Sequence, residues 1–155
     1  MKTRDTDFVF PVLGFTPDKE IWAFEDMETL TSCGPRTLKN NIQIGMELVD
    51  SDGRRWIVRS VTRLGRAYSL SRSMLTLFLS AIIQSRIEEE IEPLEPLSLT
   101  EVKARVCAAL EAFPEDFGQY LETDNELAPF LAQVRADPNI ASIPKMLGLD
   151  NCESY

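Results

Sequence analysis

A pair of strand-like segments around Asp52 and Gly53 is the feature that most restricts how this chain can fold. The segments GMELV and RRWIVRSV flank the dipeptide, and the second is rich in β-branched and aromatic residues, which favour strands. Asp-Gly is a favoured two-residue turn because both central positions need positive φ, which Gly adopts freely and Asp tolerates. The sequence therefore predicts an antiparallel β-hairpin over residues 46–61.

The acidic D-x-D-G pattern of this turn has a second interpretation, a calcium loop. An EF-hand loop supplies oxygen ligands around a glycine and ends in a bidentate glutamate. If Gly53 is that glycine, Asp50 and Asp52 fall on ligand positions, but Leu48 replaces the first aspartate and Arg59 the terminal glutamate. We therefore favour the structural hairpin, and we expect no metal and no other cofactor.

The first part of the chain, residues 1–92, is rich in strand signals. DFVFPVL at 7–13 and EIWAF at 20–24 are predicted strands around the turn sequence TPDK. A short helix capped by Asp26 is expected next, and Gly34 with the following proline is expected to end it.

Three segments follow the hairpin. We expect a connecting loop at 64–73. The apolar run MLTLFLSAII at 74–83 fits a helix or a strand, because periodicity does not separate the two in so short a run. SRIEEEI at 85–91 predicts a further strand, and its charges suit the edge of a sheet.

The second part, residues 97–150, is predicted to be helical. Capping boxes at 98–101 and 123–126 each begin a helix with an apolar face, and SIPKMLG predicts a last helical turn. Such apolar faces pack on a sheet. A chain of 155 residues is long enough for one domain with a core. The predicted fold is α+β: a single domain over 1–155, with an N-terminal antiparallel sheet packed against C-terminal helices.

The composition excludes most common catalytic systems. Histidine is absent, which removes the Ser-His-Asp, Cys-His and H-E-x-x-H arrangements, and the seven glycines stand singly, without a nucleotide-binding loop. The three cysteines are widely spaced, as is typical of reduced thiols in a cytoplasmic protein. No secretory signal is recognisable, and the run at 74–83 is too short to cross a bilayer. We expect a cytoplasmic protein that is not an enzyme.

Charge is distributed unevenly along the chain. Residues 1–87 carry a net charge of +2 and residues 88–155 a net charge of −11. Seven arginines and no acid lie in residues 53–87, and EEEIEPLE follows directly. The two runs either neutralise each other across the fold or leave an acidic docking surface, and both readings stay open. A low pI repels phosphates, so a basic protein is a better partner than nucleic acid.

The candidate partner-binding residues follow from this asymmetry. They are the acids after the arginine run and the residues near the predicted inter-helix turn: Glu88, Glu90, Glu92, Glu115, Asp116 and Tyr120. Tyr120 or Trp56 could anchor a partner, although large aromatic side chains more often belong to a core. For catalysis by paired carboxylates the only candidates are Glu115 with Asp116 and the cluster from Glu88 to Glu90, and adjacent surface acids rarely share a cleft with separated pKa values.

The order of elements is similar to that of immunity proteins in bacterial polymorphic-toxin systems. The resemblance is carried by EIWAF, TLKN, the stretch IGMELVDSDGRRWIV and the helix start LSLTEV, over residues 20–147. The longer apolar stretch at 74–83 departs from the pattern. The resemblance implies a protein that neutralises a cognate toxin by direct association and without catalytic residues. From the charge asymmetry we expect that toxin to be a basic domain. The alternative is an adaptor or chaperone-like protein for a secreted effector.

Overall fold

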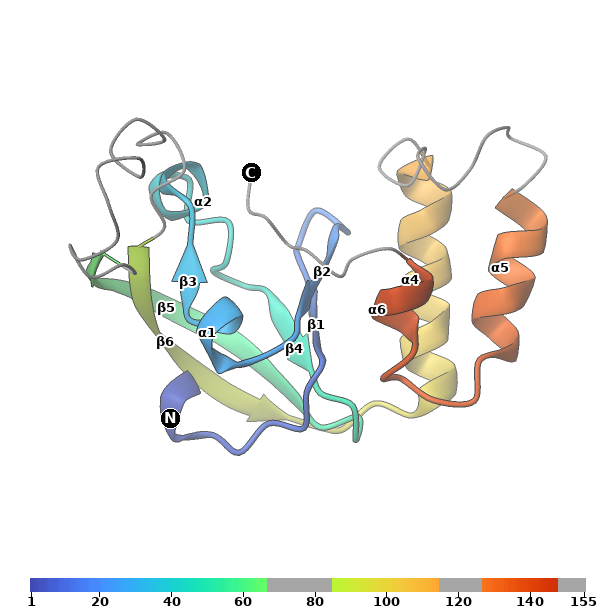
Figure 1. Cartoon of the computed structure of the whole chain (residues 1–155), viewed down its shortest axis with the longest axis horizontal. Helices are drawn as coiled ribbons and strands as arrows, with labels where there is room; N and C mark the ends of the chain where they lie inside the picture. The colour runs from blue at the N-terminus through green and yellow to red at the C-terminus, as the bar shows by residue number, and fades with distance from the viewer. Residues whose placement is uncertain (67–84, 115–126, 148–155) are drawn as a thin grey trace, which may run out of the picture.

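The computed structural model describes residues 1–66, 85–114 and 127–147, and it confirms the predicted α+β class (Figure 1). The N-terminal part forms an antiparallel sheet, and the C-terminal part is helical. The apolar run at 74–83 and the second capping box at 123–126 lie outside the described residues. The elements are η1 (Thr3–Asp5), β1 (Val12–Phe15), β2 (Ile21–Phe24), α1 (Met27–Leu30), β3 (Ser32–Cys33), α2 (Pro35–Lys39), β4 (Glu47–Val49), β5 (Arg55–Arg66), β6 (Ser85–Leu94), α4 (Leu99–Ala112), α5 (Leu127–Ala136) and α6 (Ile143–Met146).

The sheet has six strands in the order β2-β1-β4-β5-β6-β3, and each neighbouring pair is antiparallel. Its longest ladder joins β5 to β6, from the pair Arg55 and Leu94 to the pair Arg66 and Ser85. The register of this ladder shifts between Val58 and Ser60 and again near Gly65. Such bulges bend a strand and increase its twist, which suits the curl of the sheet in Figure 1.

The predicted hairpin is present, but its turn is larger than expected. Strands β4 and β5 pair from Glu47 to Val49, and the Gly53 N–H donates to the Asp50 carbonyl at 2.9 Å. Gly53 has φ +82°, whereas Asp52 is not among the described residues with positive φ. The predicted two-residue primed turn is therefore wrong. A turn from Asp50 followed by a left-handed glycine forms the longer hairpin loop.

Local capping signals predicted two helix starts and missed a third. Asp26 caps α1, and Ser98 forms both reciprocal bonds of the capping box of α4 with Glu101. Helix α1 ends at Leu30, before the stop predicted at Gly34 and the following proline, and Pro35 instead begins a further helix, α2. Proline suits the first helical position, since that residue needs no N–H partner.

Strands β5 and β6 differ from the expectation in extent and position. Strand β5 continues to Arg66, so 64–66 are not part of a loop. Strand β6 is not an open edge: β3 pairs with its first residues, and the N–H of Ile91 donates to the Met1 carbonyl at 2.8 Å. The first strand is also shorter than the predicted range 7–13, since β1 covers only Val12–Phe15.

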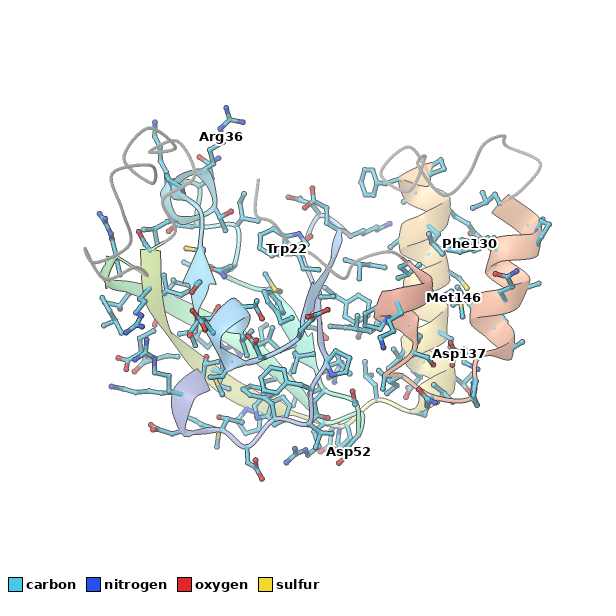
Figure 2. The ribbon with its side chains drawn as sticks, viewed as in Figure 1. Trp22, Arg36, Asp52, Phe130, Asp137 and Met146 are labelled. Carbon is cyan, nitrogen blue, oxygen red and sulfur yellow. The ribbon has the colours of Figure 1, made fainter. Side chains whose placement is uncertain are left out.

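Side-chain alternation places two apolar clusters on opposite faces of the sheet. In β1, Leu13 and Phe15 face the helices and Val12 faces the interior of the curl. The helices thus cover the side of the sheet formed by β1, β2 and β4. In Figure 2, Phe130 of α5 and Met146 of α6 lie on the helical side, where both pack against this cluster. The interior cluster consists of Phe8, Val12, Phe24, Leu30, Met46, Leu48, Trp56, Val58 and Ile91.

Candidate partner-binding surface

Strand β6 directs its acidic residues to two different faces. Ser85, Ile87, Glu89 and Ile91 are buried, and the residues between them face outward. Successive residues of a strand point to opposite faces of a sheet. The predicted partner residues Glu88, Glu90 and Glu92 therefore form one row on the outer face, which we call the β6 acidic row.

Basic and polar neighbours contact each carboxylate of the β6 acidic row. Lys2 Nζ lies 2.9 Å from Glu88, and this hydrogen bond raises the pKa of Lys2 above its usual value. Arg59 Nε donates to Glu92 at 2.7 Å, and the Ser60 hydroxyl donates to Glu90 at 3.4 Å. The interpretation that arginines and glutamates neutralise each other thus applies to at least one pair across β5 and β6.

The remaining predicted residues have different positions. Glu115, Asp116 and Tyr120 lie outside the described residues, so their part in binding stays a prediction. Trp56 is buried in the interior cluster, with its ring centroid 4.7 Å from that of Phe8 in an edge-on arrangement. The structural reading of Trp56 as a core residue is confirmed, and this side chain does not form part of an exposed surface.

Glu89 is the residue that sequence reasoning missed. Only 1% of it is exposed, and burial raises the pKa of its carboxyl to about 7, opposed by a hydrogen bond from Thr3. The sequence alone places it in the cluster from Glu88 to Glu90, which is expected at the surface. The signal was available, because a strand that buries Ile87 and Ile91 must also direct Glu89 inward.

One of the two acidic residues of the turn, Asp50, binds backbone N–H groups of the hairpin and of the N-terminal segment. The carboxylate of Asp50 is fully buried and accepts hydrogen bonds from the backbone N–H groups of Asp52, Arg54 and Val9 at 2.9–3.3 Å. It also pairs with the Arg54 guanidinium at 2.8 Å. Asp52 is exposed at the tip of the hairpin (Figure 2). Within the described ranges, no group of three or more Cys, Asp or Glu side chains could hold a metal ion.

A second charged cluster joins the sheet to α4. Glu47 Oε2 accepts from Arg105 at 2.6 Å and from Arg55 at 3.2 Å, so one carboxylate connects β4, β5 and the helix. Both guanidiniums also lower the pKa of nearby Glu101, after the larger effect of its hydrogen bonds to Ser98. The charges balance within the cluster, which indicates a structural joint. It relates residues far apart in the chain, and no local sequence pattern predicts it.

Comparison of the chain with models of protein families, with curated proteins and with solved structures finds no match. In the part of the chain that the structure describes, no helix has the length and apolar character needed to span a bilayer.

Proposed function

We propose that this protein neutralises a cognate bacterial toxin by direct association, and that the β6 acidic row is part of the surface that binds the toxin. The observation that carries the proposal is the outward alignment of Glu88, Glu90 and Glu92 on one strand. Outward residues of a strand are spaced by about 7 Å. Because β5 holds β6 along most of its length, the row presents three carboxylates in a defined geometry to a basic partner.

The internal ion pairs leave Glu90 and Glu92 exposed and Glu88 partly exposed. Arg59 and Glu92 each expose more than half of their side chains, and Lys2 exposes 48%. Exposed ion pairs contribute only about 0–1 kcal/mol. A cationic partner can therefore replace Lys2 and Arg59 at little cost, and the long-range field of the acids speeds its approach.

A second group of acids along the sequence supports the same proposal. Residues 115–126, which lie between α4 and α5 in the chain, contain five acids and no base. Glu115 and Asp116 belong to it, and we propose them, with Tyr120, as a further part of the partner-binding surface. A basic toxin domain fits both groups of acids, because each would be electrostatically complementary to it.

The test is the association kinetics of the protein with the toxin domain encoded beside it. One variant replaces Glu88, Glu90 and Glu92 with Gln. Its matched control neutralises three other exposed acids, Asp18→Asn, Glu25→Gln and Glu28→Gln, and so has the same net charge. A separate variant, Glu115→Gln with Asp116→Asn, tests the second group of acids.

The β6 variant should associate about tenfold more slowly at low salt than the matched control, and the two should converge at high salt, because charges at an interface rim act mainly on the on-rate. Equal association rates for the β6 variant and its control would exclude the β6 acidic row. Co-expression tests the activity itself: the proposed inhibitor restores growth to cells that make the toxin. Co-purification without restored growth would indicate the adaptor function instead.

A further inference from the structure

The N-terminal segment lies beside β6, and its side chains contact both faces of that strand. We call residues 1–6 the strap. The Met1 carbonyl accepts a hydrogen bond from the Ile91 N–H at 2.8 Å, and the backbones of Lys2 and Glu90 pair in an isolated antiparallel β-bridge. On the outer face Lys2 also pairs with Glu88. The strap closes on itself through η1, in which the Thr6 N–H donates to the carbonyl of residue 3 at 3.1 Å.

Thr3 connects the strap to the buried face of the same strand. Its side chain is fully buried, and its hydroxyl donates to Glu89 Oε2 at 2.9 Å. The second oxygen, Glu89 Oε1, is buried and has no hydrogen-bond partner in the described part of the protein. An ionised carboxylate offers about four acceptor sites, and here the Thr3 hydroxyl is the side-chain donor to only one of them. This geometry fits a neutral carboxylic acid far better than a buried anion.

We propose that the burial of Glu89 beneath the strap acts as a pH-dependent latch: the strap stays on β6 while Glu89 is protonated and is released when Glu89 ionises, because burying the charged carboxylate costs more than its one hydrogen bond from Thr3 returns. The proposal rests on the burial of both side chains, the hydrogen bond between them and the unpartnered Oε1. It does not depend on the proposed function. The strap is the element whose release exposes Glu89 to water most readily, because β5 and β6 are joined by a long ladder.

The charged and titratable groups around Glu89 do not stabilise its ionised form enough to offset its burial. Burial, and to a smaller extent the charge of Glu89 when it is ionised, raises the pKa of the Cys33 thiol of β3 to about 11, so this thiol stays uncharged. Arg63 of β5 is exposed, and its charge lowers the pKa of the same thiol. Lys2 is engaged with Glu88 on the outer face. Burial therefore dominates and raises the pKa of Glu89 to about 7, against 4.5 for a solvated glutamate.

The sign of the response follows from these two pKa values. The closed strap holds the Glu89 proton more tightly than the open strap, so protons favour closure. The opening equilibrium should rise with pH between about 4.5 and about 7 and become constant above that range. Release also removes Lys2 from Glu88. If the proposed function is correct, opening would free one carboxylate of the β6 acidic row.

Hydrogen exchange of single backbone amides tests the latch. The N–H groups of Ile91 and Thr6 report the strap, because each donates to a strap carbonyl. The Ile87 N–H donates to Thr31 at 2.9 Å and serves as an internal reference on the same strand. After correction for intrinsic rates, the strap amides should lose about tenfold protection per pH unit between pH 5.5 and 6.5. Ile87 should stay more protected than Ile91 throughout.

Three variants complete the test. Glu89→Gln keeps the side-chain shape and should abolish the pH dependence of strap protection. Glu88→Gln, the control on the outer face, should retain it. Thr3→Val should shift the upper limit of the pH dependence above 7, since the Thr3 hydroxyl lowers the pKa of Glu89. Equal protection of Ile91 and Ile87 would overturn the proposal, as would an unchanged pH response in Glu89→Gln.

Discussion

Replacing Gly53 with alanine should destabilise the protein by about 1.5–3.5 kcal/mol, although the residue lies in a surface hairpin. Gly53 has φ +82°, and a Cβ atom built there would lie 2.4 Å from the carbonyl oxygen of Leu97. Leu97 directly precedes the N-cap of α4, and its N–H donates to the Gly53 carbonyl at 2.9 Å. The hairpin turn therefore contacts the beginning of the helical part through backbone atoms, which have little freedom to move.

The magnitude has two contributions. A residue with a side chain loses about 1–2 kcal/mol in the left-handed conformation. Relief of the contact with Leu97 must move one of the two backbones, and loss of the hydrogen bond between them costs a further ~0.5–1.5 kcal/mol. Valine at position 53 should cost more than alanine, because a β-branched residue is a genuine outlier at positive φ.

Gly45→Ala is the matched control for this substitution. Gly45 has nearly the same conformation, φ +84°, but its added Cβ would meet the Pro17 side chain at 3.2 Å instead of a backbone oxygen. It should therefore cost only the conformational ~1–2 kcal/mol. The assay is urea unfolding, in which a lower midpoint at constant m reports a change in stability. Equal losses for the two variants would refute the role of Leu97, and no loss in either would refute the left-handed turn.

Other substitutions test the buried polar groups. Asp50→Ala should destabilise the protein by about 2–4 kcal/mol in urea unfolding, since it leaves three backbone N–H groups without their carboxylate acceptor. Asp52→Ala should change stability by less than ~0.5 kcal/mol, and calcium should shift the melting temperature of neither wild type nor this variant. The wild-type stability should fall by up to about 3 kcal/mol as pH rises from 4.5 to 7, and Glu89→Gln should remove that dependence in pH-resolved unfolding. Native Cys33 should resist alkylation at pH 8, and reductant should leave the melting temperature unchanged, because Cys33 and Cys107 are free buried thiols whose pKa values burial raises.

The elements that sequence reasoning predicted best are those specified by neighbouring residues. The start of α4 depends on Ser98 and Glu101, which are three residues apart and bond to each other. The hairpin turn was predicted less well because a distant contact shapes it. Asp50 binds the backbone N–H of Val9, 41 residues away, and this bond cannot be read from the D-x-D-G pattern.

The candidate site shows the same division. The outward row on β6 follows from alternation along a predicted strand, and the same alternation could have placed Glu89 inside. The partners of these acids could not be predicted. Thr3 and Glu89 are separated by 86 residues, and Arg59 and Glu92 by 33. These contacts depend on how the strands and the strap assemble, so they appear only in the folded structure.

The run of three glutamates also has a role in strand register. A shift of β6 by one residue against β5 would turn Glu88 and Glu90 inward and expose Ile87 and Ile91, because side chains alternate with a period of two. Two carboxylates would then replace two apolar side chains in the interior. In the native register a single acid is buried, and Thr3 binds it. The cross-strand contacts of Glu92 with Arg59 and of Glu90 with Ser60 add to this selection on the outer face. The charge asymmetry along this part of the sequence therefore helps to specify the fold, whether or not a partner also uses the exposed row.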